Sequence, residues 1–292
     1  MTLHLRPVQP DFAAVATGVD LARPLEAATL AAIVAGLDRH AVLVFPDQPL
    51  EQAQQVAMAR QFGPLDPGLK KLQKQPERLN EFELIDISNL DTAGRPMDRD
   101  SRKVVGNIAN QFWHSDSSFQ SVVATYSMLS AVVLPGWGGA TEFADLRAAW
   151  DALPAALQRE IEGREAEHDA LHSRGLLGDT NYGPEQRAVL PPVVWPLVRT
   201  HPGSGRKLLF CGIHAHRILG MSVAEGRMLL RDLLEHATQP AFVYRHEWRV
   251  GDLVMWDNRS TLHRGRRYDL AEPRELRRTT NVDLAAVGAR AA

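Results

Sequence analysis

Two kinds of hydrophobic spacing alternate along the first part of the chain. Apolar side chains recur every three or four positions over 26–38, which predicts an amphipathic helix. The continuous apolar run 41–45 is ended by Pro46 and predicts a buried strand. A second amphipathic helix is predicted from about Leu50 until Gly63-Pro64. We interpret these elements as scaffold.

Strand-like runs dominate the second half of the chain. The run 122–133 is long and mostly apolar, and it ends at Pro135-Gly136. A pair of helices is predicted over 146–162, and a capping box of Ser222 and Glu225 predicts the start of another helix. The remaining predicted strands, of which the first two form a hairpin, are 197–201, 207–210, 241–248, 252–256 and 274–283. Strands separated by turns favour an antiparallel β barrel or sandwich decorated by helices over alternating βαβ units.

Residues 66–103 are the least regular part of the sequence. A strand is predicted at 82–87, the stretch 91–103 is polar and rich in turn residues, and strand character resumes at Val104. One interpretation is a solvated surface excursion. The other is a lid over a site, because long loops in compact domains are disproportionately functional.

The bulk composition is that of an ordinary globular protein. Of the 292 residues, 45% are hydrophobic and 23% are charged, and one domain over 1–292 is the simpler expectation. The net charge of −2 gives no general attraction to nucleic acid or to a membrane. Cys211 is the only cysteine, which excludes an internal disulfide and a thiolate metal cluster and fits a reducing cytoplasm.

The start of the chain has no signal-peptide pattern, and no run of 18 or more apolar residues occurs. We therefore expect a cytoplasmic protein with no nucleic-acid partner and no membrane partner. We also expect it to form a homo-oligomer.

The most informative chemistry lies in Trp113-His114-Ser115-Asp116 and in a distant histidine, His263. In an extended strand, residues two apart point to the same side, so His114 and Asp116 can converge on one atom. A second imidazole would complete the two-histidine, one-carboxylate set of non-haem Fe(II) oxygenases. His-x-Asp alone is a weak signal, because a surface histidine beside a solvated aspartate gives the same pattern.

Six arginines fall within residues 264–278, which is a strongly basic stretch in a nearly neutral protein. One interpretation is a solvated or nucleic-acid-facing surface. If 274–280 is a strand, however, Arg274, Leu276, Arg278 and Thr280 share one face, and Arg277 points the other way. Two arginines on one face suit the binding of carboxylates, because guanidinium and carboxylate form two parallel hydrogen bonds.

Several motifs together resemble the taurine dioxygenase family of Fe(II)- and 2-oxoglutarate-dependent oxygenases. They are His114-x-Asp116, Gly139-Ala140-Thr141, Trp256-Asp257-Asn258 leading into His263, and Arg274 eleven residues after that histidine. The resemblance extends from Gly18 to Thr279. It implies a mostly β fold with helices (α+β), in which a double-stranded β-helix, or jelly roll, surrounds the metal.

The resemblance also implies a role for each site residue. His114, Asp116 and His263 would ligate Fe(II). Thr141 and Arg274 would bind the far carboxylate of 2-oxoglutarate, and Arg278 would bind the carboxylate of the second substrate. O2 would be the other cosubstrate.

The implied reaction couples conversion of 2-oxoglutarate to succinate and CO2 with hydroxylation of a small carboxylate substrate. The runs 110–120, 251–259 and 264–269 look most like family members that act on aryloxyacetates such as 2,4-dichlorophenoxyacetate. Hydroxylation next to the ether oxygen would yield a phenol and glyoxylate. Alternatives with the same chemistry are a phenoxypropionate or an aliphatic sulfonate such as taurine. More distant alternatives are a zinc-dependent hydrolase and a non-catalytic β-barrel binding protein.

Other polar residues near the predicted strands have no assigned role. His201, His214 and His216 are candidates for substrate contact, although ordinary packing accounts for most such histidines. Lys71 and Lys103 could meet an anionic substrate or be solvated.

Overall fold

The computed structural model describes residues 2–68 and 78–282. The helices are α1 (Ala27–His40), α2 (Gln52–Arg60), α3 (Arg102–Ile108), α4 (Leu146–Asp151), α5 (Ala155–Ile161), α6 (Ala170–Gly175), α7 (Pro184–Ala188) and α8 (Val223–Ala237), with short 3₁₀ turns η2 (Ala109–Gln111) and η3 (Pro240–Phe242). The strands are β1 (His4–Pro7), β2 (Ala14–Thr17), β3 (Val42–Phe45), β4 (Ile85–Ser88), β5 (Ala124–Val133), β6 (Thr141–Asp145), β7 (Glu165–His168), β8 (Val193–Pro196), β9 (Val198–Thr200), β10 (Lys207–Leu209), β11 (Ala215–Ile218), β12 (Val243–His246), β13 (Leu253–Asp257), β14 (Thr261–Gly265) and β15 (Glu275–Val282).

The largest sheet has seven strands in the order β1-β2-β3-β13-β5-β15-β4. Its central strand β13 is buried at every position, which explains why its first four residues are all apolar. Alternate residues of β13 face opposite sides: Leu253 and Met255 pack under α1 and α2, whereas Val254 and Trp256 face the interior.

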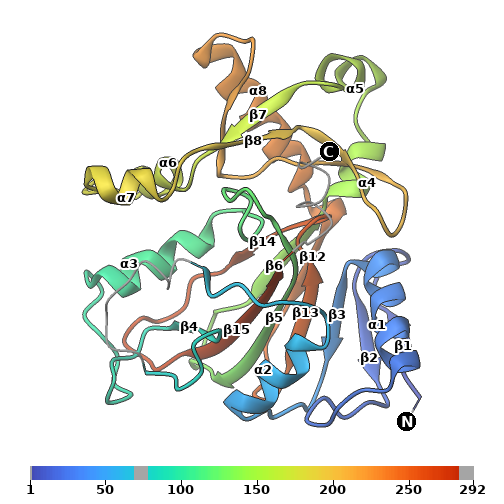
Figure 1. Ribbon diagram of the computed structural model, residues 1–292, viewed down its shortest axis with the longest axis vertical. Helices are drawn as coiled ribbons and strands as arrows, with labels where there is room; N and C mark the ends of the chain where they lie inside the picture. The colour runs from blue at the N-terminus through green and yellow to red at the C-terminus, as the bar shows by residue number, and fades with distance from the viewer. Residues whose placement is uncertain (1, 69–77, 283–292) are drawn as a thin grey trace.

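A second, three-stranded sheet, β12-β6-β14, covers the interior face of the large sheet. Phe143 of β6 is fully buried, and its ring centroid lies 5.4 Å from that of Trp256 on β13. The two sheets therefore share one core (Figure 1). This sandwich of mainly antiparallel strands with helices outside confirms the predicted jelly roll.

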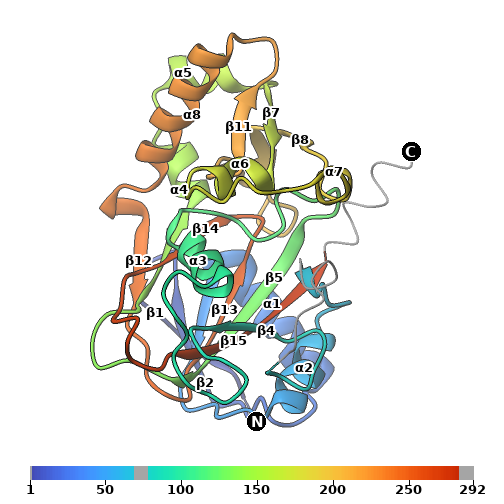
Figure 2. The same ribbon diagram turned by 90° about the vertical axis from the view of Figure 1, so that its left-hand side faces the viewer.

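A third layer packs on the other side of the β12-β6-β14 sheet. It contains the small sheet β11-β7-β8, the hairpin β9-β10 and the helices α4 and α8. Figures 1 and 2 both show β7, β8 and α8 above the two main sheets. Trp150, Leu209 and Leu233 form its core with Leu262 of β14, so this layer is attached directly to the strand that carries His263.

The local predictions were confirmed for most long elements. The first two helices, the helix pair, the β9-β10 hairpin and the Ser222/Glu225 capping box are all present. The strand predicted from Val104 was wrong at its start, because Val104 lies in helix α3. The Ser101 side chain accepts a hydrogen bond from the Val104 backbone N–H and caps this helix, and Val104 is buried.

Only part of the predicted lid, 66–103, falls within the described residues. Lys70 and Lys71 lie outside the described residues. In the described part, β4 pairs with β15 as an edge strand of the large sheet, so residues 85–88 belong to the scaffold. Closure of the remaining segment stays a prediction, as does the single domain over 1–292. No helix in the described residues is long and apolar enough to cross a membrane.

His168 on β7 gives the fold a testable pH dependence. Its side chain is buried against Phe210, and neither ring nitrogen has a hydrogen-bond partner among the described residues. Burial, with a smaller contribution from Arg199, lowers the pKa of His168 to about 3. As the pH falls below the ordinary histidine pKa of about 6.5, the unfolded chain therefore gains a proton that the folded chain does not take up.

We expect this histidine to reduce stability progressively between about pH 6.5 and pH 3, by up to about 1.4 kcal/mol per pH unit. His168→Phe should remove that contribution, which denaturant unfolding of the metal-free protein at several pH values would measure. Unfolding at pH 8, where the histidine is neutral in both states, gives the effect of packing alone. An unchanged pH slope in the variant would contradict the assignment.

Candidate metal centre

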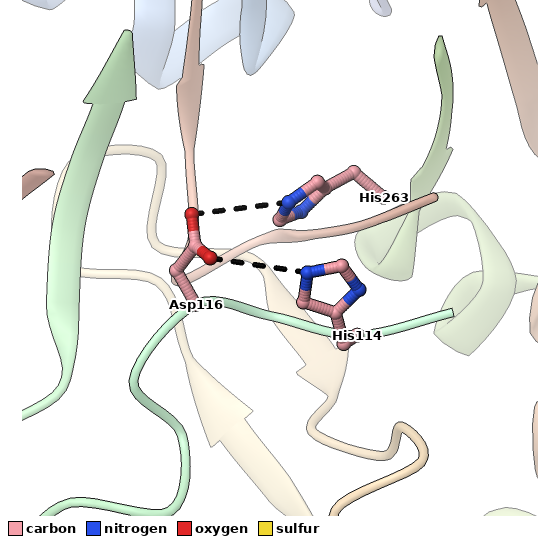
Figure 3. Close-up of side chains that lie close together, drawn as sticks. All are labelled: His114, Asp116 and His263. Carbon is pink, nitrogen blue, oxygen red and sulfur yellow. Dashed lines mark ion pairs between the residues drawn. The ribbon is translucent and has the colours of Figure 1, made fainter. Parts of the chain in front are cut away.

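His114, Asp116 and His263 lie together beside β14, an outer strand of the β12-β6-β14 sheet, and His263 is the middle residue of that strand. Their ligand atoms are all within 4.8 Å of one another, and all three side chains are buried. The Nε2 atom of His114 lies 3.9 Å from Asp116 Oδ1, and that of His263 lies 3.8 Å from Asp116 Oδ2 (Figure 3). The sequence prediction that these residues converge thus agrees with the structure.

Backbone pairing brings these distant parts of the chain together. The His114 N–H donates to the His263 carbonyl at 3.0 Å, and the His263 N–H donates to the His114 carbonyl at 2.8 Å. The segment around His114 thus pairs with β14 over a single bridge. His114 Nδ1 lies 2.8 Å from the Phe112 carbonyl oxygen, which can only accept a hydrogen bond, so the proton lies on Nδ1. Nε2 is therefore unprotonated, and its lone pair is available to bind a metal.

The protonation states favour a cation at this position. Burial lowers the pKa of His114 and lowers that of His263 well below its ordinary value, so both imidazoles are neutral at pH 7. Burial alone would raise the pKa of Asp116, but the charge of Arg278 and the hydrogen bond from Ser127 favour the ionised form, and the pKa is about 2. Neutral imidazoles and an ionised carboxylate are the forms that bind a metal.

The separations also fit a metal. A bond of about 2.1 Å to each of two donors requires the donors to lie within about 4.2 Å of each other. The separations of Asp116 from His114 and from His263, 3.9 and 3.8 Å, meet this limit. Two imidazoles and one carboxylate on one side of an ion leave other coordination positions free, as in non-haem iron oxygenases.

Arg278 reaches the same place from β15. Its Nη1 lies 2.5 Å from Asp116 Oδ1, and its Nε is buried with no partner among the described residues. Thr280, two residues further along the strand, also lies on this side, because its hydroxyl contacts Ser127 beside Asp116. Glu275 and Arg277 pair with each other, and Glu275 also binds Arg78. The predicted division of the strand into two faces therefore agrees with these contacts.

Arg274 is a buried cation of a different kind. It has no ion pair with an acidic side chain among the described residues: its Nη2 donates to the Gly139 carbonyl at 3.1 Å, and its guanidinium lies over the Tyr268 ring. Burial lowers its pKa to about 10, so it remains charged at pH 7. An uncompensated buried charge is costly, and an anionic ligand would relieve that cost.

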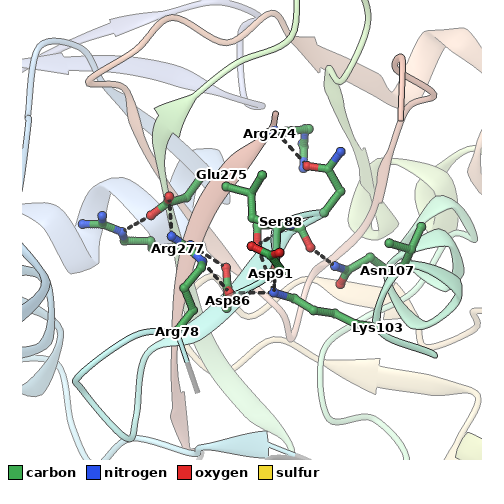
Figure 4. A network of polar contacts seen from close by, with 12 residues as sticks. Arg78, Asp86, Ser88, Asp91, Lys103, Asn107, Arg274, Glu275 and Arg277 are labelled. Atoms are coloured by element: carbon green, nitrogen blue, oxygen red, sulfur yellow. Dashed lines mark hydrogen bonds and ion pairs between the residues drawn. The ribbon is translucent and has the colours of Figure 1, made fainter. Parts of the chain in front are cut away.

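The backbone of Arg274 is held by the segment that precedes α3. Its N–H donates to Asn89 Oδ1 at 2.9 Å, and this contact adjoins a network of buried and half-buried charges (Figure 4). In that network Lys103 binds Asp86, Ser88 and the Leu90 carbonyl, so it is a structural residue in this arrangement and not a free cation at the site.

Thr141 is buried at the start of β6, two residues after the Gly139 carbonyl that Arg274 contacts. Its Oγ1 accepts a hydrogen bond from Trp248 Nε1 at 3.0 Å. Since indole N–H can only donate, the threonine proton remains available for an acceptor such as a carboxylate.

The other predicted histidines fall into two groups. The His214 ring lies 6.2 Å from that of His114 and 4.9 Å from that of Phe119, so it adjoins the metal candidates. His201 instead binds Asp257 at 2.9 Å in a fully buried pair, and His216 pairs with Glu167. Of these three histidines, only His214 is therefore placed to contact a molecule bound near His114, Asp116 and His263, which we call the triad.

Sequence reasoning missed the polar residues that surround Asp116. Asn258 and Ser127 both contact this region, and Trp248 contacts Thr141. Asn258 belongs to the Trp256-Asp257-Asn258 motif, which pointed to the family but not to a role. Ser127 lies inside a long apolar strand, and its polarity at a buried position was the available signal.

Residues 4–280 match the family described as "Taurine catabolism dioxygenase TauD, TfdA family". The chain belongs to this family, and it is a dioxygenase that uses non-haem Fe(II), 2-oxoglutarate and O2. The predicted enzyme class and cofactors are thereby confirmed.

Individual relatives narrow the comparison further. The chain is 59% identical, over 98% of its length and 100% of the relative's, to the alpha-ketoglutarate-dependent 2,4-dichlorophenoxyacetate dioxygenase of Cupriavidus pinatubonensis. It is 39% identical, over 92% of its length and 91% of the relative's, to an (S)-phenoxypropionate/alpha-ketoglutarate dioxygenase of Sphingobium herbicidovorans. Among solved structures, AAD-2 in complex with Mn(II) and N-oxalylglycine matches with a TM-score of 0.90 and 46% identity, covering 97% of this chain and 98% of that one.

Removal of one candidate donor tests the metal assignment directly. We expect His114→Ala and Asp116→Ala each to weaken Co(II) binding by more than about 100-fold, because the loss of a ligand should exceed the roughly 10–100-fold cost of losing a residue that only supports one. Anaerobic Co(II) titration followed by absorption measures the affinity. His4→Ala, at an exposed histidine of β1, is the control. Wild-type affinity in either ligand variant would contradict the assignment.

Proposed function

We propose that the protein hydroxylates an aryloxyacetate such as 2,4-dichlorophenoxyacetate next to its ether oxygen. The expected products are the phenol, glyoxylate, succinate and CO2. His114, Asp116 and His263 would hold Fe(II), which supplies the activation of O2 when 2-oxoglutarate is bound. The observation that carries this proposal is the different contacts of two arginines: Arg278 contacts Asp116, whereas the buried Arg274 contacts Gly139 and Tyr268.

The reacting carbon of an aryloxyacetate is bonded directly to its carboxylate. Whatever binds that carboxylate must therefore lie within a few ångströms of the iron, and Arg278, 2.5 Å from Asp116 Oδ1, meets this requirement. The guanidinium has further N–H groups, including the unpartnered Nε, with which it can bind the substrate while it stays near Asp116.

2-Oxoglutarate needs a more distant anchor. Its two carboxylates are at opposite ends of a five-carbon chain, so the end that meets the metal and the end that is held far away require separate partners. Arg274 has no acidic partner among the described residues, and its contacts are with Gly139 and Tyr268 and not with the triad. The Thr141 hydroxyl, whose proton is free, would add a second donor to the same carboxylate.

Burial of the triad keeps bulk water away from the proposed reaction site. His114, Asp116 and His263 are each less than a tenth exposed. A reacting C–H bond held there by Arg278 is kept from bulk water, and the electrostatic interactions of the site are strengthened. His214 and Phe119 lie on the side of His114 and are suited to contact the aryl ring.

The localisation and the oligomeric state of the enzyme are also proposals. We propose the cytoplasm, on the ground that the single cysteine, Cys211, is a free buried thiol, as a reducing compartment allows. The homo-oligomer stays a prediction, which the mass of the native protein in solution would test.

A substrate panel tests the reaction. With Fe(II), 2-oxoglutarate and O2, 2,4-dichlorophenoxyacetate should give one phenol for each succinate, with a higher kcat/KM than (S)-phenoxypropionates or taurine. The phenoxypropionate comparison is included because relatives with that named activity are 39% and 37% identical. Succinate release with taurine but with no phenoxy acid would overturn the proposed substrate and keep the enzyme class.

The two arginines should differ in which substrate they affect. Because loss of a buried charge partner costs about 2 kcal/mol or more, we expect Arg274→Ala to raise the KM for 2-oxoglutarate roughly 30-fold or more, with a smaller effect on the aryloxyacetate. Arg278→Ala should do the reverse. Saturating Fe(II) in each assay separates these effects from a change in metal affinity. The opposite order would mean that the two anion sites are exchanged.

A further inference from the structure

A buried hydrogen-bond network surrounds Asp116 and includes no metal-ligand candidate other than Asp116 itself. Its central residue is Asn258, which follows β13 and is 1% exposed. The Ser115 hydroxyl donates to the Asn258 carbonyl at 2.7 Å, and the Asp116 N–H donates to Asn258 Oδ1 at 3.2 Å. Asn258 therefore holds the backbone on which the Asp116 side chain stands.

The same asparagine acts on the carboxylate through Ser127. Asn258 Nδ2 donates to Ser127 Oγ at 2.9 Å, and Ser127 Oγ donates to Asp116 Oδ2 at 2.7 Å. Ser127 is fully buried on β5. Ser127 Oγ also lies 3.1 Å from Thr280 Oγ1. The carboxylate of Asp116 is the nearer and the charged acceptor, so the single proton of the serine goes to Asp116.

Trp256 fixes the orientation of the Asn258 amide. Its indole Nε1, which can only donate, lies 3.0 Å from Asn258 Oδ1. The oxygen of the amide is thereby assigned to Trp256 and the nitrogen to Ser127. The Trp256 ring also lies 4.7 Å from that of His263, so one motif supports two of the three candidate ligands.

We propose that Asn258 and Ser127 are positioning residues of the metal centre, which fix the rotation of the Asp116 carboxylate and so set the affinity for the divalent ion. The inference rests on the proposed function, because it requires Asp116 to be a metal ligand. With Arg278 on Oδ1 and Ser127 on Oδ2, both carboxylate oxygens are oriented before a metal arrives. This preorganisation lowers the entropy cost of binding.

Two substitutions separate positioning from general stability. Asn258→Asp keeps the acceptor for Asp116 N–H and Trp256, but it replaces the donor to Ser127 by an acceptor, which competes with Asp116 for the serine proton. Ser127→Ala removes the donor to Asp116 together with the hydroxyl contacts to Asn258 Nδ2 and Thr280 Oγ1, and it leaves the Asn258 contacts with Asp116 N–H and Trp256 in place. We expect each variant to bind Co(II) roughly 10–100-fold more weakly than wild type, with an altered visible absorption spectrum of the bound ion, since the carboxylate is freer to rotate.

The chain offers a matched control for each variant. Asn281→Asp changes another fully buried asparagine, whose amide donates to the Ala59 and Gly63 carbonyls. Ser130→Ala changes another buried serine of β5, which donates to Gln55. Both controls should keep wild-type Co(II) affinity and spectrum within about threefold, whatever they do to the thermal unfolding of the metal-free protein.

The outcomes distinguish the positioning role of Asn258 and Ser127 from the existence of the metal site. Weakened Co(II) binding and an altered spectrum in Asn258→Asp and Ser127→Ala, but not in the controls, supports positioning. Equal weakening in all four variants, or none in the first two, overturns it and leaves the metal site intact. A wild-type protein that binds no Co(II) overturns the proposed function itself. Should Asn258→Asp not fold, Ser127→Ala decides alone.

Discussion

The pairing of His114 with His263 through two backbone hydrogen bonds is the constraint on which the candidate site depends. It attaches the segment of the His-x-Asp motif to β14, which is itself paired with β6 and packed against the third layer of the fold. The two imidazoles therefore do not depend on flexible loops for their separation. β13 lies across the core from them and contributes Trp256 and the residues that follow it. The register of the paired strands, which is costly to change, thus fixes the relative positions of the three metal-ligand atoms.

The two arginines show how one charged residue type serves two purposes. Arg278 forms an ion pair with Asp116, and this carboxylate stays ionised although it is buried. Arg274 keeps its charge with only a carbonyl and an aromatic ring beside it. Arg278 lies on β15 and contacts Asp116, whereas Arg274 directly precedes β15 and contacts Gly139 and Tyr268. In the proposed function, these two neighbouring arginines bind two different anions.

The sequence supported the prediction of the fold and of the candidate residues, but not of their partners. The spacing of His114 and Asp116 suggested a shared direction, and strand parity placed Arg278 with Thr280. His263, in contrast, became a candidate only as part of several motifs, because spacing cannot show which distant strand will pair with residue 114. The small strands β7, β8 and β11 were not predicted, since four-residue strands of mixed polarity gain their stability from partners far away in the sequence. The Ser127 and Asn258 contacts depend on the antiparallel pairing of β5 with β13, which no local pattern encodes.

The charged side chains of the site also determine its net charge when metal and both substrates are bound. Asp116, Arg274, Arg278 and a ferrous ion together carry a formal charge of plus three in the proposed arrangement. The two carboxylates of 2-oxoglutarate and the single one of an aryloxyacetate cancel it completely. A partly filled site leaves net charge in a region of low polarity, which is unfavourable. The ligands should consequently bind cooperatively, each anion improving the electrostatic environment for the metal and for the other.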